Sequence, residues 1–194
     1  MSTPAKCLPC ATALAATFDP ALIERLGREL LAPEAKLKRA ALLLGPTCNT
    51  ARSPLGGRAF ESFSEDAHLS GALAAALVRG VQAGGVGATI KHFVGNDKEE
   101  DRFGYNVVVS PRALREVYLM PFMLAEKHAR PWAYMTACVQ GIVHDARAET
   151  DSVHNFRYNR VNGVHMSENA FILQDVLRGE WGSDATIMSD WFVS

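Results

Sequence analysis

The sequence predicts an α/β fold built on a parallel sheet. Four short apolar runs have the length and composition of strands that are buried on both faces; they cover residues 41–45, 88–94, 132–137 and 185–191. Stretches with helical spacing alternate with these runs. This alternation favours parallel strands joined by right-handed crossovers, as in an open doubly wound sheet or a (β/α)8 barrel. Four such units would make half of a barrel.

The predicted helices cover residues 20–31, 66–82, 110–128 and 169–180. The first follows Asp19, a typical capping residue, and has Pro20 at its first position. The second ends before a pair of glycines, 84 and 85, which is a common helix stop. In each helix, apolar residues recur at steps of three and four, so that one face can pack on the sheet. The predicted order is therefore αβαβαβαβ.

Length and composition limit the class of protein. The chain has 194 residues, enough for one domain, with 48% hydrophobic and 21% charged residues. Its 20 Lys and Arg residues balance 21 Asp and Glu residues, so we expect neither nucleic acid nor a membrane surface as a partner. No apolar run approaches the roughly 18–20 residues of a membrane span. The first ten residues resemble no secretory signal, which predicts a cytoplasmic chain unless its true beginning lies upstream and its parent is secreted.

Three local patterns favour structural roles. Cys7-x-x-Cys10 has the spacing of a redox pair or half a zinc site, but no second such pair follows it. The glycines of residues 82–87 lead into a strand instead of following one, which is the reverse of a phosphate loop. The acidic run 97–101 contains an interleaved lysine and is typical of a solvated loop rather than a metal site.

Polar residues end or follow several of the predicted strands. Asp190 lies at the end of a buried run, where a carboxylate needs a partner, so a catalytic or ligand-binding role is favoured over helix capping. Lys91 and His92 are adjacent, so only one can reach the barrel axis unless the strand bends or bulges. Arg52 begins a Pro/Gly turn, 52–58, whose two arginines can bind carboxylates or hydroxyls; an ordinary surface loop is the alternative.

Six motifs, in order, resemble glycoside hydrolase family 3, and specifically its β-glucosidases. They are GPT at 45–47, RSPLGGRAFESFSED at 52–66, ATIKHFVGND at 88–97, SPRALRE at 110–116, YNRVNG at 158–163 and MSDW at 188–191. The resemblance extends over nearly the whole chain from Cys7 onward. It implies that residues 1–194 form an incomplete N-terminal domain of that family, a partial (β/α)8 TIM-type barrel of roughly half the full number of units.

The resemblance also implies a retaining mechanism that releases terminal β-D-glucose from β-glucosides or cello-oligosaccharides. Asp190 matches the family's nucleophile, which we expect to stay ionised near neutral pH beside cationic groups. The loop after His92 lacks the Asp-x-His element of the family's N-acetylglucosaminidases, which favours the glucosidase branch. The resemblance implies neither a metal nor an organic cofactor. The residues that it assigns to the glucose subsite are Arg52, Lys91, His92, Arg102 and Tyr158.

The chain departs from the family pattern at both ends. It stops four residues after Asp190, whereas the family's acid/base, usually a glutamate, comes from a later domain. The D-G-P segment that clamps the sugar hydroxyls in the family is also missing. We therefore expect the isolated chain to be nearly inactive and, with open strand edges, prone to aggregation. The alternatives are a β-xylosidase or other family 3 exo-hydrolase, and a truncated product without catalytic function.

Residues 138–157 interrupt the family pattern, which otherwise runs from Met-Thr-Ala directly into Tyr-Asn-Arg. One interpretation is a metal-binding loop with Cys138, His144 and His154 as ligands, although their spacing is irregular. The favoured hypothesis is a translated intron, because codons at its ends can spell splice sites and its removal restores Ala-Tyr. We expect the segment to be a structureless, mobile loop that separates Tyr158 from the strand before it.

Overall fold

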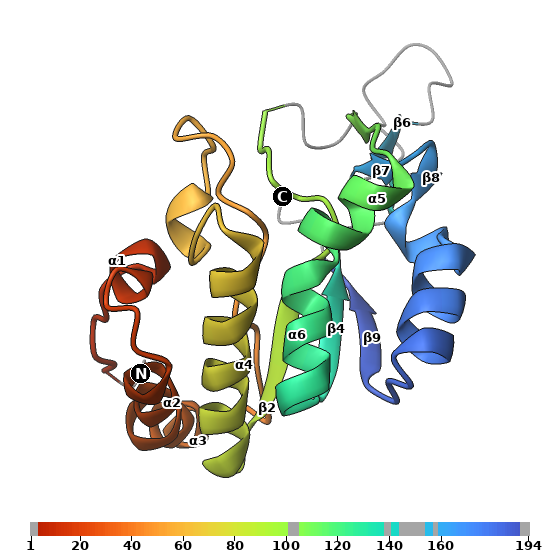
Figure 1. Ribbon diagram of the computed structural model, residues 1–194. Helices are drawn as coiled ribbons and strands as arrows, with labels where there is room; N and C mark the ends of the chain where they lie inside the picture. The colour runs from red at the N-terminus through yellow and green to blue at the C-terminus, as the bar shows by residue number, and fades with distance from the viewer. Residues whose placement is uncertain (1–3, 101–104, 138–140, 144–153, 157–158, 191–194) are drawn as a thin grey trace.

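The computed structural model describes residues 4–100, 105–137, 141–143, 154–156 and 159–190. A four-stranded parallel sheet lies at its centre (Figure 1). Its strands, in sheet order, are β1 (Leu42–Leu43), β2 (Gly87–Phe93), β4 (Ala133–Thr136) and β9 (Thr186–Ser189). These are the four strands that the sequence predicts, and each pairs in parallel with the next one along the chain. The predicted α/β class with a parallel sheet is confirmed.

Helices lie against the sheet, and α4 and α6 run side by side in front of it (Figure 1). The helical elements are α2 (Pro20–Leu26), η1 (Gly27–Leu31), α3 (Ala32–Leu37), α4 (Ala67–Ala83), α5 (Pro111–Ala113), η3 (Leu114–Tyr118), α6 (Met120–Ala129) and η5 (Phe171–Glu180). All four predicted helices are present. Three of them contain π-helical turns, at η1, η3 and η5. A pattern of apolar residues does not distinguish such turns from regular α-helix.

Capping side chains fix where the helices begin. Asp19 Oδ1 accepts the backbone N–H groups of Ala21 and Leu22, each at 3.0 Å. Asp66 caps α4 in the same way, accepting the N–H of Leu69 at 2.7 Å. These bonds satisfy donors that the first turn of a helix leaves without a partner. The predicted helix starts are confirmed to within two residues, but the first helical stretch continues through α3 to Leu37, beyond its predicted end at residue 31.

Several short elements were not predicted from the sequence. They are α1 (Ala11–Ala15), η2 (Ala59–Glu61), η4 (Met166–Glu168), β3 (Asn106–Val107), β7 (Arg160–Val161), β8 (Val164–His165), β5 (Gly141–Val143) and β6 (His154–Phe156). Strands β3, β7 and β8 form a small sheet, and β5 pairs antiparallel with β6. Both β5 and β6 lie within residues 138–157, so the expectation that this segment lacks structure is wrong for its described part. The other residues of the segment lie outside the described ranges.

The main core lies between the sheet and its helices. Phe93 of β2 contacts Phe122 of α6 and Tyr134 of β4 edge-to-face, with ring centroids 5.0 and 5.2 Å apart. All three residues are buried. Of the cysteines in the described ranges, Cys7 and Cys10 are exposed, Cys48 is buried, and all three are free thiols. No helix in the described part has both the length and the apolar composition needed to cross a membrane.

Candidate active site

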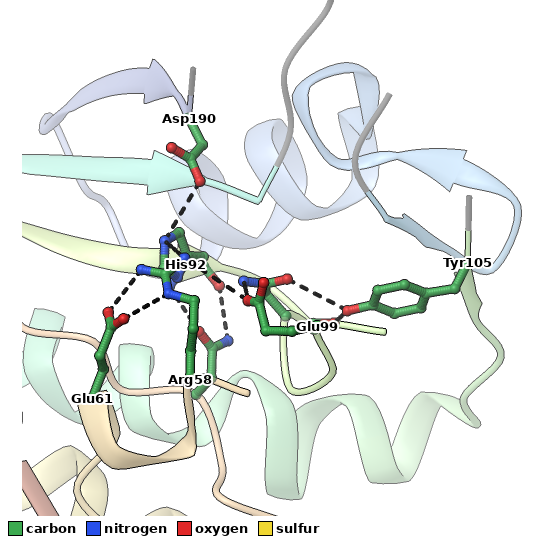
Figure 2. Close-up of polar contacts among 9 residues, drawn as sticks. Arg58, Glu61, His92, Glu99, Tyr105 and Asp190 are labelled. Atoms are coloured by element: carbon green, nitrogen blue, oxygen red, sulfur yellow. Dashed lines mark hydrogen bonds and ion pairs between the residues drawn. The ribbon is translucent and has the colours of Figure 1, made fainter. Parts of the chain in front are cut away.

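The polar residues that the sequence places at strand ends meet at the carboxyl edge of the sheet. Asp190 directly follows β9, and His92 lies near the end of β2. Their side chains approach one another, with His92 Nε2 3.5 Å from Asp190 Oδ2 (Figure 2). The His92 side chain is 3% exposed and that of Asp190 is 16% exposed, so water reaches the carboxylate but scarcely the ring. This edge is where α/β proteins with parallel strands bind their ligands.

A bulge in β2 places His92 in this position. Lys91 pairs with Met135 and Phe93 pairs with Thr136, so His92 has no opposite residue on β4. The side chain of Asn49 satisfies the backbone of His92 instead. Asn49 Nδ2 donates to the His92 carbonyl at 2.9 Å, and its Oδ1 accepts the His92 N–H at 2.8 Å. From the sequence, we expected that Lys91 and His92 could serve the same site only if the strand bends or bulges. The strand has such a bulge.

Arg58 lies between His92 and two glutamates (Figure 2). Its Nε and Nη2 donate to the two carboxylate oxygens of Glu61, at 2.6 and 2.7 Å. Its third nitrogen, Nη1, lies 3.5 Å from His92 Nε2 and 3.8 Å from an oxygen of Glu99. Arg58 directly precedes η2, a helical turn of only three residues, and Glu61 is the last residue of that turn. The planar fork of a guanidinium matches a carboxylate in this bidentate geometry.

The loop after β2 brings Glu99 to this cluster. Asn96 Nδ2 donates to Glu99 Oε1 at 3.3 Å, and Tyr105 donates its hydroxyl to the Gly95 carbonyl at 2.9 Å. Lys98 and Glu100 are exposed and form an ion pair with each other. The prediction that the acidic run is a solvated loop is thus correct for Lys98 and Glu100. It is wrong for Glu99, whose side chain is only 16% exposed.

The charged side chains of the cluster shift one another's pKa values. The hydrogen bond to Arg58 lowers the pKa of Glu61. Burial lowers the pKa of Lys91, and the negative charges of Glu61 and Asp190 counter that effect. The hydrogen bond to Glu61 raises the pKa of Arg58, with smaller contributions from Glu99 and Asp190. Asp190 therefore lies in the field of two cations, Arg58 and Lys91.

A second carboxylate in this region has a different environment. Asp97 is largely buried, and burial raises its pKa to about 6, although the charge of Arg52 opposes the shift. Hydrogen bonds from Thr50 to Asp97 also oppose the shift. Both residues line a pocket that Arg58 and His92 also line. The acidic run is therefore not a solvated loop at Asp97 either.

The other predicted site residues divide into two groups. Arg52 is exposed; it donates a hydrogen bond to the Tyr118 hydroxyl, and its guanidinium lies 5.9 Å from the centre of the Tyr118 ring. Of the two arginines in the 52–58 turn, the structure brings Arg58 rather than Arg52 to His92. Arg102 and Tyr158 lie outside the described residues.

From the sequence, Arg58 was named with Arg52 as able to bind carboxylates or hydroxyls, but Glu61, Glu99 and Asn49 were not predicted as members of the cluster. The spacing of Arg58 and Glu61, three residues apart, was the one available signal for their ion pair. Within the described ranges, no three His, Cys, Asp or Glu side chains are grouped to hold a metal ion. Cys138 and His144, which belong to the metal-binding alternative, lie outside those ranges.

Fold and site together define an α/β protein that holds a carboxylate, an imidazole and two cationic side chains at the carboxyl edge of a parallel sheet. Residues 2–194 match the model of the glycosyl hydrolase family 3 N-terminal domain. The chain belongs to this family, as its motifs indicate.

Curated relatives of similar sequence are named β-glucosidases. A "probable beta-glucosidase J" of Neosartorya fischeri is 52% identical over 97% of this chain and 19% of its own length. A "probable beta-glucosidase I" of Aspergillus flavus is 49% identical over 97% of this chain and 20% of its own. This chain therefore spans about a fifth of the length of these relatives.

Solved β-glucosidases share the fold. The enzyme of Kluyveromyces marxianus in complex with glucose is 48% identical, with a TM-score of 0.83 over 96% of this chain and 20% of its own. β-Glucosidase 3B of Thermotoga neapolitana, also in complex with glucose, is 40% identical, with a TM-score of 0.82 over 96% of this chain and 23% of its own. At these identities, the likeness extends beyond the fold to the family.

Proposed function

We propose that this chain is part of a retaining β-glucosidase that releases terminal, non-reducing β-D-glucose. The observation that carries the proposal is the pairing of Asp190 with His92 beside Arg58, at the carboxyl edge of the sheet. The names of the relatives and the glucose complexes of similar structures support the substrate. The longer protein that contains this chain is called the full-length enzyme below.

We propose that the four parallel strands are half of a (β/α)8 barrel. The support is their order: each strand pairs with the next along the chain, and helical segments alternate with the strands. Closing the barrel would require strands on the outer sides of β1 and β9. Those strands, and the acid/base carboxyl group, would come from outside residues 1–194, in agreement with the greater length of the relatives.

In the proposed mechanism, Asp190 attacks the anomeric carbon while an acid from outside this chain protonates the leaving oxygen. The glycosyl–Asp190 ester then reacts with water, which the same outside group activates as a base. Lys91 and His92 hydrogen-bond to the sugar hydroxyls and hold the ring for attack. Arg58 and Lys91 keep Asp190 ionised between turnovers. We assign Arg102 and Tyr158 to the same subsite on the strength of their motifs alone.

Within the 52–58 turn, the proposal transfers the sugar-binding role from Arg52 to Arg58. The approach of Arg58 to His92 supports this choice, as does the contact of Arg52 with Tyr118. Replacing each arginine by lysine in the full-length enzyme tests it. We expect Arg58→Lys to raise KM for a nitrophenyl β-glucoside at least about tenfold, and Arg52→Lys to change it less than about threefold. A larger effect at Arg52 would restore the original assignment.

The activity itself is tested on the full-length enzyme with nitrophenyl β-D-glucoside and β-D-xyloside side by side. We expect the glucoside to be preferred in kcat/KM and the first product to retain the β configuration. Preference for the xyloside would establish the β-xylosidase alternative. Failure to hydrolyse either would favour a product without catalytic function. We expect the isolated 194-residue chain to be nearly inactive, because general acid catalysis alone contributes about 10²–10⁴ in rate.

We also propose that residues 138–157 are a translated intron, and that the mature enzyme runs from Ala137 directly to Tyr158. Sequencing the transcript across this region tests the proposal. A spliced transcript that still encodes these residues would contradict it.

A further inference from the structure

The ion pair between Arg58 and Glu61 uses only part of the guanidinium. Two of its nitrogens, Nε and Nη2, bind both oxygens of Glu61. The remaining nitrogen, Nη1, faces His92 at 3.5 Å (Figure 2). A bidentate pair fixes the plane of a guanidinium as well as its position. Glu61 thereby determines which N–H groups of Arg58 are available to the site.

The backbone places Glu61 close to Lys91 as well. Thr47 forms parallel bridges with Lys91 on one side and with Ser62, the neighbour of Glu61, on the other. The Cys48 N–H donates to the Lys91 carbonyl at 2.8 Å, which fastens this segment to the end of β2. Glu61 is thus tied through two backbone connections to the strand that carries Lys91. Its negative charge raises the pKa of Lys91 against the effect of burial.

A competing carboxylate lies on the other side of Arg58. The Glu99 oxygen is 3.8 Å from Arg58 Nη1, beyond hydrogen-bond distance, and Glu99 already accepts a bond from Asn96. If Glu61 lost its charge, Glu99 would become the strongest anionic partner for the guanidinium. Arg58 would then turn toward Glu99, in the loop after β2, and away from the space beside His92 and Asp190.

From this geometry we propose that Glu61 is a positioning residue for the active site: it clamps Arg58 in the orientation that faces His92 and Asp190, and it supports the charge of Lys91. This inference rests on the proposed function. Glu61 itself does not touch the substrate or the reacting atoms. It acts through two side chains that do.

The same chain offers a control for a purely structural role. Arg115 Nη1 and Nη2 donate to the two oxygens of Glu180 at 2.5 and 2.6 Å, in a fork like that of Arg58 and Glu61. That pair is more exposed and lies on η3 and η5, away from the carboxyl edge of the sheet. Ion pairs of this exposure contribute little to stability. Glu180→Gln therefore measures how much the loss of one bidentate ion pair lowers the Tm when the site is not affected.

The test compares Glu61→Gln, Arg58→Lys, the double variant and Glu180→Gln in the full-length enzyme, by kcat, KM and thermal unfolding. We expect Glu61→Gln to lower kcat/KM about 10- to 100-fold, with a Tm within about 2 °C of that of Glu180→Gln. The loss in the double variant should be smaller than the product of the two single losses, because Glu61 acts in part through Arg58 and such residues are non-additive. Glu61→Asp, which keeps the charge, should recover part of the activity.

The pH profile supplies a readout that a structural role would not change. Without the charge of Glu61, the pKa of Lys91 should fall, and the alkaline limb of kcat/KM should move to lower pH. An unchanged kcat/KM, additive effects in the double variant, or a loss of activity matched by a large fall in Tm would each overturn the inference. If the unmodified enzyme hydrolyses neither glycoside, the proposed function fails and the inference fails with it. Normal activity in Glu61→Gln defeats the inference alone.

Discussion

The polar cluster at the carboxyl edge of the sheet and the aromatic core differ in how their side chains are held. In the core, Phe93, Phe122 and Tyr134 are fully buried and contact one another through ring edges and faces. At the edge, His92 and Asp190 are held by charge, by hydrogen bonds and by a bulge in the same strand, β2. The bulge is thus the boundary within β2 between Lys91 and His92, which belong to the candidate site, and Phe93, which packs in the core. Variants of the two groups should separate stability from activity.

The largest effect is expected at Asp190. Asp190→Asn in the full-length enzyme should lower kcat at least about 10³-fold, because the amide cannot form the glycosyl ester. Its Tm should stay within about 2 °C of the unmodified enzyme, since asparagine has nearly the same size and shape as aspartate. Asp175→Asn, on the exposed face of η5, is the control and should leave both quantities unchanged. If Asp190→Asn kept a tenth of the activity, Asp190 would not be the nucleophile.

The core variant should show the opposite pattern. Phe122→Ala removes a fully buried ring and should lower the free energy of unfolding by about 3–5 kcal/mol, measured by denaturant titration. Phe60→Ala, at a ring that is 56% exposed, should cost less than about 1 kcal/mol. Equal costs at the two positions would mean that the aromatic cluster is not the core of the domain.

Asp97 should make stability depend on pH. Its folded pKa of about 6 lies above the ordinary aspartate value of 3.8, so the folded state binds the proton more tightly. The contribution of Asp97 to the free energy of unfolding is therefore fully present below about pH 4 and is lost as the pH rises toward 6. A shift of about two units corresponds to about 3 kcal/mol. In Asp97→Asn this loss should disappear, so that the variant unfolds at higher denaturant than the unmodified enzyme at pH 7 but not at pH 4.

Glu100→Gln, in the same loop and exposed, controls for the change in net charge. It should leave the pH dependence of unfolding as it is. Identical pH profiles for Asp97→Asn and the unmodified enzyme would show that Asp97 is solvated in the folded protein.

Asn49, at the boundary, should affect both stability and activity. Asn49→Asp keeps an acceptor for the His92 N–H but removes the donor to its buried carbonyl, which should cost about 1–3 kcal/mol. Because the bulge then shifts, kcat should also fall. Asn162 binds the N–H and carbonyl of Val109 in the same manner at an exposed position, and Asn162→Asp should cost less than about 1 kcal/mol. If Asn49→Asp changed neither the free energy of unfolding nor kcat, the bulge would not depend on Asn49.

The four helices could be predicted because each is long enough for its apolar pattern to repeat, and the four strands of the main sheet because each falls within a short apolar run. Lys91, His92 and Asp190 could be predicted because polar residues are rare at the ends of buried strands. The choice between Arg52 and Arg58 could not, since η2 has three residues and so carries no periodicity. Asn49 pairs with a residue 43 positions away, a contact that no local pattern encodes.

The burial of Asp97 likewise depends on neighbours from distant segments. The acidic run that contains it has the composition of a solvated loop, and Lys98 and Glu100 behave accordingly. Asp97 differs because it faces the pocket shared with Arg58 and His92. Composition alone does not reveal which members of a charged run turn inward.

The most direct test of the account is to identify the residue that bonds to the sugar. The full-length enzyme is treated with a 2-deoxy-2-fluoro-β-glucoside that carries a good leaving group, then digested, and the labelled peptide is sequenced by mass spectrometry. We predict one fluoroglucosyl group, on Asp190, and none in Asp190→Asn. A label on any other carboxylate, with Asp190 unmodified, would contradict the assignment of the nucleophile and the site built around it.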